Sequence, residues 1–334
     1  MLEILRSPLG FGSAPIGNMF ENIPDAEAQR TIDAAWDDGI RYFDTAPLYG
    51  AGLAELRLGA ALKHRNRGEY VVSSKVGRLV MDEMEDVDAR DLGEKAGVFR
   101  HGRPNRIVTD YSERATFQSV EDSLERLGTD YLDIVWVHDV AQDFFGDEWI
   151  GRFEEARTGA FRALERLKAM GTVRAWGLGV NRVEPIELLM GLKGPRPDGF
   201  LLAGRYTLLD HALALQRVMP LAAERGLGIV VGGPYSSGVL VGGATYEYAP
   251  APPEILARVA RIREVADEHS VDVKTAALWF GLYHPAVVSV IPGSSSAAQI
   301  ASNRHAFERE VPPGFWRDLR ANGLISPGAP VPLE

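Results

Sequence analysis

Residues 132–138, Leu-Asp-Ile-Val-Trp-Val-His, form an almost continuous apolar run that ends in a histidine. Such a run is typical of a strand covered on both faces, as in a parallel sheet that lies under helices. Residues 229–231, Ile-Val-Val, form a second run of this kind. Between such runs lie longer segments of helical period, which is the pattern of parallel strands joined by crossover helices.

The alternation predicts eight strands and eight helices, and therefore a single-domain (β/α)8 barrel, an α/β fold of the TIM type, over residues 1–334. The strands are expected at 9–13, 41–44, 70–75, 132–138, 174–180, 199–203, 228–232 and 287–291, and the helices at 25–39, 52–64, 111–127, 152–170, 183–191, 210–225, 253–268 and 296–306. An open, doubly wound sheet is the alternative, and the strand count favours the barrel.

Three irregular stretches, 77–110, 139–151 and 235–252, are rich in glycine, proline and charge. Each follows a predicted strand. In a barrel, long loops of this kind lie at the carboxyl ends of the strands, where they shape the substrate site. We therefore expect all three at the catalytic face.

The composition and charge of the chain argue against several classes of binding partner. With 36 basic and 46 acidic residues the chain carries a formal net charge of −10, which repels a phosphate backbone and argues against nucleic acid. No apolar run approaches the roughly eighteen residues of a membrane span, and the start of the chain does not resemble a signal peptide. The absence of cysteine excludes disulfides and thiolate chemistry and fits a reducing compartment, so we expect a cytoplasmic protein acting on a small molecule.

Three apolar strands end in an ionisable residue: Asp44, Lys75 and His138. A polar residue at one strand end is commonplace. In a parallel barrel, however, successive strands direct their carboxyl ends into one shared cavity, so these three side chains are expected to lie together. Their joint occurrence predicts a site.

Tyr49 follows Asp44 in the loop Asp-Thr-Ala-Pro-Leu-Tyr-Gly, which Pro47 and Gly50 would turn back over the barrel mouth. A phenol titrates near 10, and an ammonium about 4 Å away would lower that pKa by roughly two to three units. Lys75 is the expected ammonium, Asp44 would hold it charged, and His138 would donate a hydrogen bond to the substrate oxygen. These residues predict proton transfer by Tyr49.

Two other uses of such a site are weaker. A Schiff base would need Lys75 to be uncharged, which a neighbouring carboxylate opposes. A metal site is disfavoured because the seven histidines are scattered and no pair has ligand spacing, so no metal is expected.

Five ordered motifs resemble those of the aldo-keto reductases. They are Leu-Gly-Phe-Gly12-Ser13, Phe-Asp44-Thr-Ala-Pro-Leu-Tyr49-Gly, Ser-Ser-Lys75-Val-Gly, Ser-Leu-Glu-Arg-Leu-Gly-Thr-Asp-Tyr-Leu-Asp133 and Val-His138. The resemblance covers nearly the whole chain. It implies that Asp44, Tyr49, Lys75 and His138 form a catalytic tetrad, and that Gly12, Ser13 and Asp44 lie at the cofactor.

The resemblance also implies a nicotinamide cofactor. Asn181 corresponds to the residue that binds the nicotinamide carboxamide, but the usual serine before it is Val180. The usual glutamine and stacking aromatic correspond to Ala203 and Gly232, which leaves the packing of the nicotinamide open. By the same resemblance the pyrophosphate loop comprises Pro234, Tyr235, Ser236, Ser237 and Gly238, and the adenine side comprises Gly293, Ser295, Gln299 and Asn303.

The adenine-side segment has serines where relatives that prefer NADP commonly have a cation, and no cation precedes Arg304. Loss of a charge-assisted phosphate contact costs roughly 1.5–3 kcal/mol, so NAD is expected as the preferred cofactor over NADP. An NAD-preferring member is expected to act as a dehydrogenase.

Residues 202–210 and 110–114 resemble the branch that oxidises free sugars at C1, which includes D-threo-aldose (L-fucose) and L-galactose dehydrogenases, with pyridoxal 4-dehydrogenases as near relatives. The alternatives are a general aldehyde or ketone reductase and, from another class, a non-catalytic cofactor-binding redox sensor. At the strand ends Met19, Phe20, Trp136 and Asp139, together with Tyr49 and His138, are candidate substrate contacts; ordinary packing is an equal interpretation for the first four.

Overall fold

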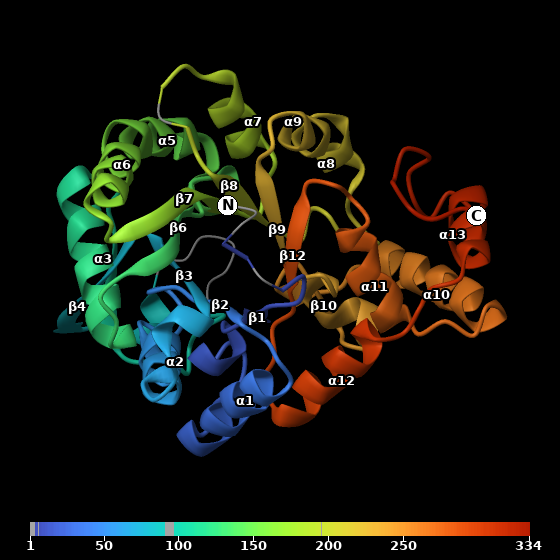
Figure 1. The fold of residues 1–334 in the computed structure, drawn as a ribbon, viewed down its shortest axis with the longest axis horizontal. Helices are drawn as coiled ribbons and strands as arrows, with labels where there is room; N and C mark the ends of the chain where they lie inside the picture. The colour runs from blue at the N-terminus through green and yellow to red at the C-terminus, as the bar shows by residue number, and fades with distance from the viewer. Residues whose placement is uncertain (1–3, 6, 91–96, 195) are drawn as a thin grey trace.

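Eight parallel strands form one sheet in the computed structural model, which describes residues 4–5, 7–90, 97–194 and 196–334. The strands, in sheet order, are β1 (Phe11–Gly12), β2 (Tyr42–Asp44), β3 (Val71–Val76), β6 (Leu132–His138), β7 (Val173–Val180), β8 (Gly199–Ala203), β9 (Gly228–Gly232) and β12 (Val287–Ile291). Parallel bridges from Leu9 to Val290 and from Gly12 to Gly293 join the two ends of the sheet. The predicted barrel is confirmed (Figure 1).

Helices surround the strands on the outside of the barrel (Figure 1). They are α1 (Asp25–Asp37), α2 (Leu53–Leu62), α3 (Glu113–Leu127), α4 (Gln142–Phe145), α5 (Trp149–Thr158), α6 (Ala160–Met170), α7 (Glu184–Gly191), α8 (Ala212–Gln216), α9 (Val218–Glu224), α10 (Pro253–Glu268), α11 (Val273–Leu282), α12 (Ala297–Phe307) and α13 (Pro313–Ala321). Ser112 caps α3 by accepting a hydrogen bond from the amide of Ala115 at 3.2 Å, which explains why this helix begins at Glu113, two residues after the predicted start.

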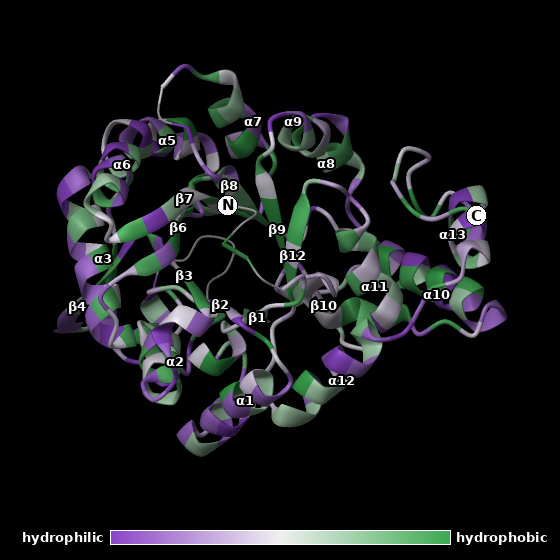
Figure 2. Cartoon of the chain, in the orientation of Figure 1, coloured by the Kyte–Doolittle hydropathy of each residue, from purple (hydrophilic) through white to green (hydrophobic). Residues whose placement is uncertain are grey.

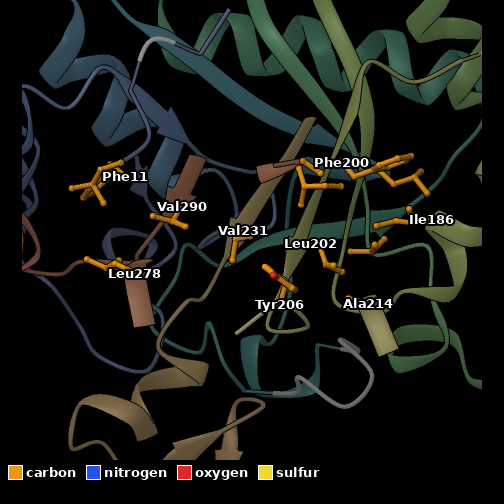
Figure 3. Packing of buried hydrophobic residues seen from close by; sticks show 14 of the residues in the cluster. Phe11, Ile186, Phe200, Leu202, Tyr206, Ala214, Val231, Leu278 and Val290 are labelled. Carbon is orange, nitrogen blue, oxygen red and sulfur yellow. The ribbon is translucent and has the colours of Figure 1, made fainter. Parts of the chain in front are cut away.

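The strands are buried on both sides, which explains their continuous apolar character. One buried cluster fills the interior of the barrel and includes Tyr42, Ile134, Trp136 and Val230. A larger cluster lies between the strands and the helices. Figure 3 shows part of this outer layer, in which side chains of β8, β9 and β12 lie near Leu278 of α11 and Ala214 of α8. The two layers hold the strand ends in place, and therefore also the side chains at those ends.

Hydropathy follows this layering, with apolar strands at the centre and polar faces on the outer helices (Figure 2). Across the ranges that the structure describes, no helix combines the length and the apolar character that crossing a membrane requires. In the same residues no three histidine, aspartate or glutamate side chains are grouped so as to hold a metal ion.

Several helix predictions need correction. The helix expected at 152–170 is two helices, α5 and α6, because Gly159 departs from helical geometry with φ −108° and ψ −81°. A Cβ at Gly159 would lie 2.4 Å from the carbonyl oxygen of Tyr111, so the chain approaches its neighbour closely at this break. The helix expected at 210–225 is likewise divided, at Arg217.

The short helix α4 and the longer helices α11 and α13 were not predicted. It is α11, and not the predicted helix 253–268, that packs against β12. The helix α10 contacts α11 and α13 instead, and so belongs to an additional layer on this side of the barrel (Figure 1).

The three irregular stretches contain more regular structure than expected. Residues 77–110 include an antiparallel pair, β4 (Arg78–Met84) with β5 (Asn105–Thr109). Residues 139–151 contain α4, and residues 235–252 contain a 3-10 segment, η6 (Ser236–Val241), and the hairpin of β10 (Thr245–Tyr246) and β11 (Ala249–Pro250). Their position at the carboxyl ends of the strands is as predicted.

Candidate active site

A buried ion pair joins the ends of β2 and β3. Lys75 Nζ donates to Asp44 Oδ2 at 2.6 Å and to the carbonyl oxygen of Thr45 at 2.8 Å. The Ser73 hydroxyl donates to the other carboxylate oxygen, Asp44 Oδ1, at 2.6 Å. Only 2% of the Lys75 side chain and 3% of the Asp44 side chain are exposed, so both charges depend on these contacts for stabilisation.

Tyr49 lies directly above this pair. The Lys75 ammonium is 4.8 Å from the centroid of its ring. The ring also stacks on Phe99, with centroids 5.6 Å apart, and meets the His138 ring edge-on at 5.9 Å. The structure therefore brings together all four side chains that the sequence placed at the strand ends and in the first loop.

Two glycines allow the Tyr49 loop to pack this closely. A Cβ at Gly17 would lie 2.8 Å from the carbonyl carbon of Tyr49, and a Cβ at Gly50 would lie 2.2 Å from the carbonyl oxygen of Gly17. Gly50 also has a φ of 65°, in the left-handed region. Any side chain at either position would displace the tyrosine backbone.

Burial raises the pKa of the Tyr49 phenol well above its usual value, and the nearby Asp44 carboxylate raises it further. The expectation that Lys75 lowers this pKa is therefore wrong for this structure. The physical reason is that burial of the phenol disfavours its ionised form, while the Lys75 charge that would favour that form is paired with Asp44 at 2.6 Å.

His138 is buried at the end of β6, and its Nε2 lies 3.2 Å from Asp139 Oδ2. Asp139 has a φ of 52°, a left-handed conformation that aspartate tolerates better than most residues. This backbone turn directs the carboxylate back toward the histidine. Asp139, a candidate substrate contact from the sequence, lies beside His138 in the structure.

A cavity opens beside these residues. Its lining comprises Ala14, Met19, Leu48, Tyr49, Lys75, Val98, Phe99, His138, Asp139, Phe144, Gly179, Val180, Asn181, Leu201, Ala203 and Tyr248. Each of the three long loops contributes side chains to it, as expected from their position. Phe20 is not among the lining residues and is 40% exposed, and Trp136 is fully buried inside the barrel, so neither of these two candidate contacts lines the cavity.

A second cavity adjoins the first and shares Asn181, Ala203 and Tyr248 with it. Small residues, among them Gly204, Gly233, Ser236 and Ser237, line much of it, so a ligand can approach the backbone closely. Arg205 pairs with Asp210 at 2.7 Å and with Glu247, which anchors the β10–β11 hairpin beside this cavity. A trough therefore runs from Tyr49 across the carboxyl ends of β7, β8 and β9.

The remaining cofactor candidates form one connected group beyond the trough. The Tyr235 hydroxyl donates to Asn303 Oδ1 at 2.8 Å, and Asn303 Nδ2 donates to the Ser294 hydroxyl at 3.0 Å. The amide of Ser295 donates to Gln299 Oε1 at 2.8 Å. Gly12 and Gly293 form a parallel bridge, and the amide of Ser13 donates to the carbonyl of Asp44 at 3.0 Å.

The model of the Aldo/keto reductase family matches residues 8–322 of this chain. The chain belongs to this family. It is an NAD(P)-dependent oxidoreductase, of a family that acts on small carbonyl compounds. The lining of the two adjoining cavities suits such a cofactor, because the small residues of the second cavity let a phosphate approach the backbone closely and the first cavity lies beside the tyrosine and the lysine.

Similar proteins are found both by sequence and by structure. The chain is 38% identical over 326 residues to pyridoxal 4-dehydrogenase of Microbacterium luteolum, covering 95% of this chain and 94% of that one. It is 37% identical over 323 residues to D-threo-aldose 1-dehydrogenase of a Pseudomonas species, with coverage of 95% and 94%. Among solved structures, the holo form of the aldo-keto reductase AKR11C1 from Bacillus halodurans superposes with a TM-score of 0.71 at 27% identity, covering 96% of this chain and 92% of that one.

For this aldo-keto reductase, sequence patterns did not single out several lining residues. Val98 and Phe99 lie in a turn and Phe144 lies in the four-residue helix α4, and neither segment is long enough for a periodicity that would mark a buried position. Tyr248 lines both cavities from the β10–β11 hairpin, with a φ of 66°. Glu247 and Tyr248 are two successive non-glycine residues with positive φ, a backbone conformation often found at functional sites. No sequence motif indicates this conformation.

Proposed function

We propose that this aldo-keto reductase oxidises an aldose, such as L-fucose, D-arabinose or L-galactose, at C1 to the lactone with NAD. The observation that carries the proposal is that Tyr49, Lys75 and His138 line one cavity whose walls come from the three long loops. A relative named D-threo-aldose 1-dehydrogenase, 37% identical over nearly the full length, supports the substrate class.

In this proposal Tyr49 is the proton-transfer group. It takes the proton of the C1 hydroxyl during oxidation and returns it to the carbonyl oxygen during reduction. His138 hydrogen-bonds the same oxygen and orients the sugar. Asp44 and Lys75 hold the Tyr49 ring in position. The nicotinamide, when bound, supplies the hydride acceptor.

The cofactor is proposed to extend along the trough. Asn181 would hold the nicotinamide end, and the loop of Pro234, Tyr235, Ser236, Ser237 and Gly238 would surround the pyrophosphate. Gly293, Ser295, Gln299 and Asn303 would hold the adenosine end, and Gly12 and Ser13 would lie beneath the dinucleotide. Gly204 and Gly233 line the second cavity and leave room for the cofactor to run from Asn181 toward the pyrophosphate loop.

We expect faster turnover with NAD than with NADP. Two cations do lie at the adenosine segment, but Lys274 donates to the Ser302 hydroxyl at 2.7 Å and Arg304 donates to Glu308 at 2.7 Å. A 2′-phosphate would have to compete for them, at a cost of roughly 1.5–3 kcal/mol for each charge-assisted contact it lacks. Initial rates at equal, subsaturating concentrations of the two cofactors measure the preference, and tenfold faster turnover with NADP would contradict it.

Pyridoxal is the second candidate substrate, because the relative at 38% identity is a pyridoxal 4-dehydrogenase. A screen of cofactor reduction over a panel of aldoses and pyridoxal distinguishes the two. Preferred turnover of an aldose supports the proposal, and preferred turnover of pyridoxal replaces it. Turnover of simple aldehydes or ketones in the reducing direction alone would indicate a general reductase, and tight cofactor binding with slow turnover of every compound would indicate a redox sensor.

The raised pKa of Tyr49 predicts opposite pH profiles for the two directions. Oxidation needs the phenolate, which is the minor form below the raised pKa, so log(kcat/KM) is expected to climb with a slope of about 1 per pH unit from neutrality upward. Reduction needs the phenol, which is the major form, so its rate stays flat over the same range. Measured profiles in both directions test this, and an oxidation plateau that begins below pH 7 would contradict it.

A further inference from the structure

Asn181 lies between two buried carboxylates. Its Nδ2 is 3.2 Å from Asp139 Oδ1 and 3.3 Å from Asp143 Oδ2. Each aspartate is 4% exposed, and the two lie in the same segment after β6, whereas Asn181 follows β7. The contacts therefore join the ends of two neighbouring strands at the point where the two cavities meet.

These contacts determine the orientation of the Asn181 amide. Ionised carboxylate oxygens only accept hydrogen bonds, so the NH2 group must face both aspartates, and its two N–H bonds are used by them. The oxygen Oδ1 then faces elsewhere and is available to accept a hydrogen bond. The neighbouring lining residues of β7 and β8, Val180, Leu201 and Ala203, have no polar side-chain atom.

Asp139 also reaches the proposed catalytic histidine. Its Oδ2 is 3.2 Å from His138 Nε2, while its Oδ1 contacts Asn181. One carboxylate group thus touches both the side chain proposed to hold the substrate oxygen and the side chain proposed to hold the nicotinamide. A shift of either partner would be transmitted to the other through a single rigid group.

We infer that Asp139 and Asp143 are positioning residues that fix the Asn181 amide, so that its Oδ1 accepts a hydrogen bond from the carboxamide NH2 of the bound nicotinamide. This inference rests on the proposed function, because it takes Asn181 as the nicotinamide contact. The pair of carboxylates supplies the orientation that the apolar Val180 and Ala203 cannot. Asp139 additionally sets the distance between the nicotinamide and the substrate oxygen.

The test compares Asp139→Asn, Asp143→Asn and a control, Asp147→Asn, which alters an exposed carboxylate in the same loop. Each substitution preserves side-chain size, and asparagine tolerates the left-handed backbone at position 139. Dissociation constants are measured by tryptophan fluorescence for NAD+ and for ADP-ribose, which lacks the nicotinamide. We expect each of the first two variants to bind NAD+ about tenfold more weakly while ADP-ribose binding stays within about twofold, and the control to leave both unchanged.

A second readout is the face of the nicotinamide ring that receives deuterium from a C1-deuterated sugar. A ring whose carboxamide has lost its anchor can present either face, so both variants are expected to label a mixture where the wild type labels one face. Parallel weakening of NAD+ and ADP-ribose, or unchanged NAD+ affinity, overturns this inference and leaves the proposed function standing. Failure of the wild type to bind any nicotinamide cofactor overturns both.

Discussion

The Tyr49→Phe variant is expected to lose about three powers of ten in kcat in both directions, because it lacks the group that exchanges a proton with the substrate oxygen. Phenylalanine keeps the ring that stacks on Phe99 and meets His138 edge-on, so the cavity should keep its shape. The dissociation constant for NAD should therefore change by less than about twofold. Steady-state kinetics and fluorescence titration measure the two effects separately.

Tyr131→Phe is a suitable control for this experiment. Tyr131 precedes β6 at the opposite end of the barrel, where its ring lies between Arg67 and Arg174. This variant should retain kcat. If Tyr49→Phe instead retained most of its activity, proton transfer would have to be assigned to another group.

The Lys75→Met variant should lose both stability and activity. Removal of the ammonium leaves the Asp44 carboxylate buried without its counter-charge, which costs about 3–5 kcal/mol in the free energy of unfolding. Kinetically, the variant should lose at least about two powers of ten in kcat, because Tyr49 loses the charged group beneath its ring. Urea unfolding and steady-state kinetics provide the two measurements.

The double variant Asp44→Asn/Lys75→Met separates these two effects. It removes both charges, so most of the lost stability should return, since no buried charge is left unpaired. Activity should remain low. Recovery of activity together with stability would show that the pair matters for folding alone, and would remove Lys75 from the proposed chemistry.

The strands could be predicted from the sequence because burial on both faces leaves an unambiguous apolar run, as at 132–138, where the observed bounds agree with the prediction. Helix ends and breaks were harder to predict. The break at Gly159 depends on the approach of the Tyr111 carbonyl, a contact between distant parts of the chain that no local pattern contains. The helix α11 is apolar around most of its circumference, because it packs against β12 and α12, so it lacks the amphipathic period that marks a surface helix.

For the site, the identity and proximity of Asp44, Tyr49, Lys75 and His138 followed from barrel geometry, but their electrostatics did not. The sequence predicted that Lys75 would lower the pKa of Tyr49, whereas the pKa is raised. That sign depends first on how deeply the phenol is buried and then on the Asp44 carboxylate near it, and neither can be read from the sequence. The Asn181 contacts with Asp139 and Asp143 depend on side-chain directions in a loop, and no spacing in the sequence encodes them.

The walls of the cavity and its floor come from different parts of the chain. Phe99, Phe144 and Tyr248 belong to three separate loops, whereas Lys75 and His138 belong to strands of the barrel. A substitution at Tyr248 can therefore change the shape of the wall while Lys75 and His138 stay fixed on their strands, whereas a substitution at Phe99 would also reach the Tyr49 ring that stacks on it. Selection for a different small molecule is thus expected to act first on the hairpin that carries Tyr248.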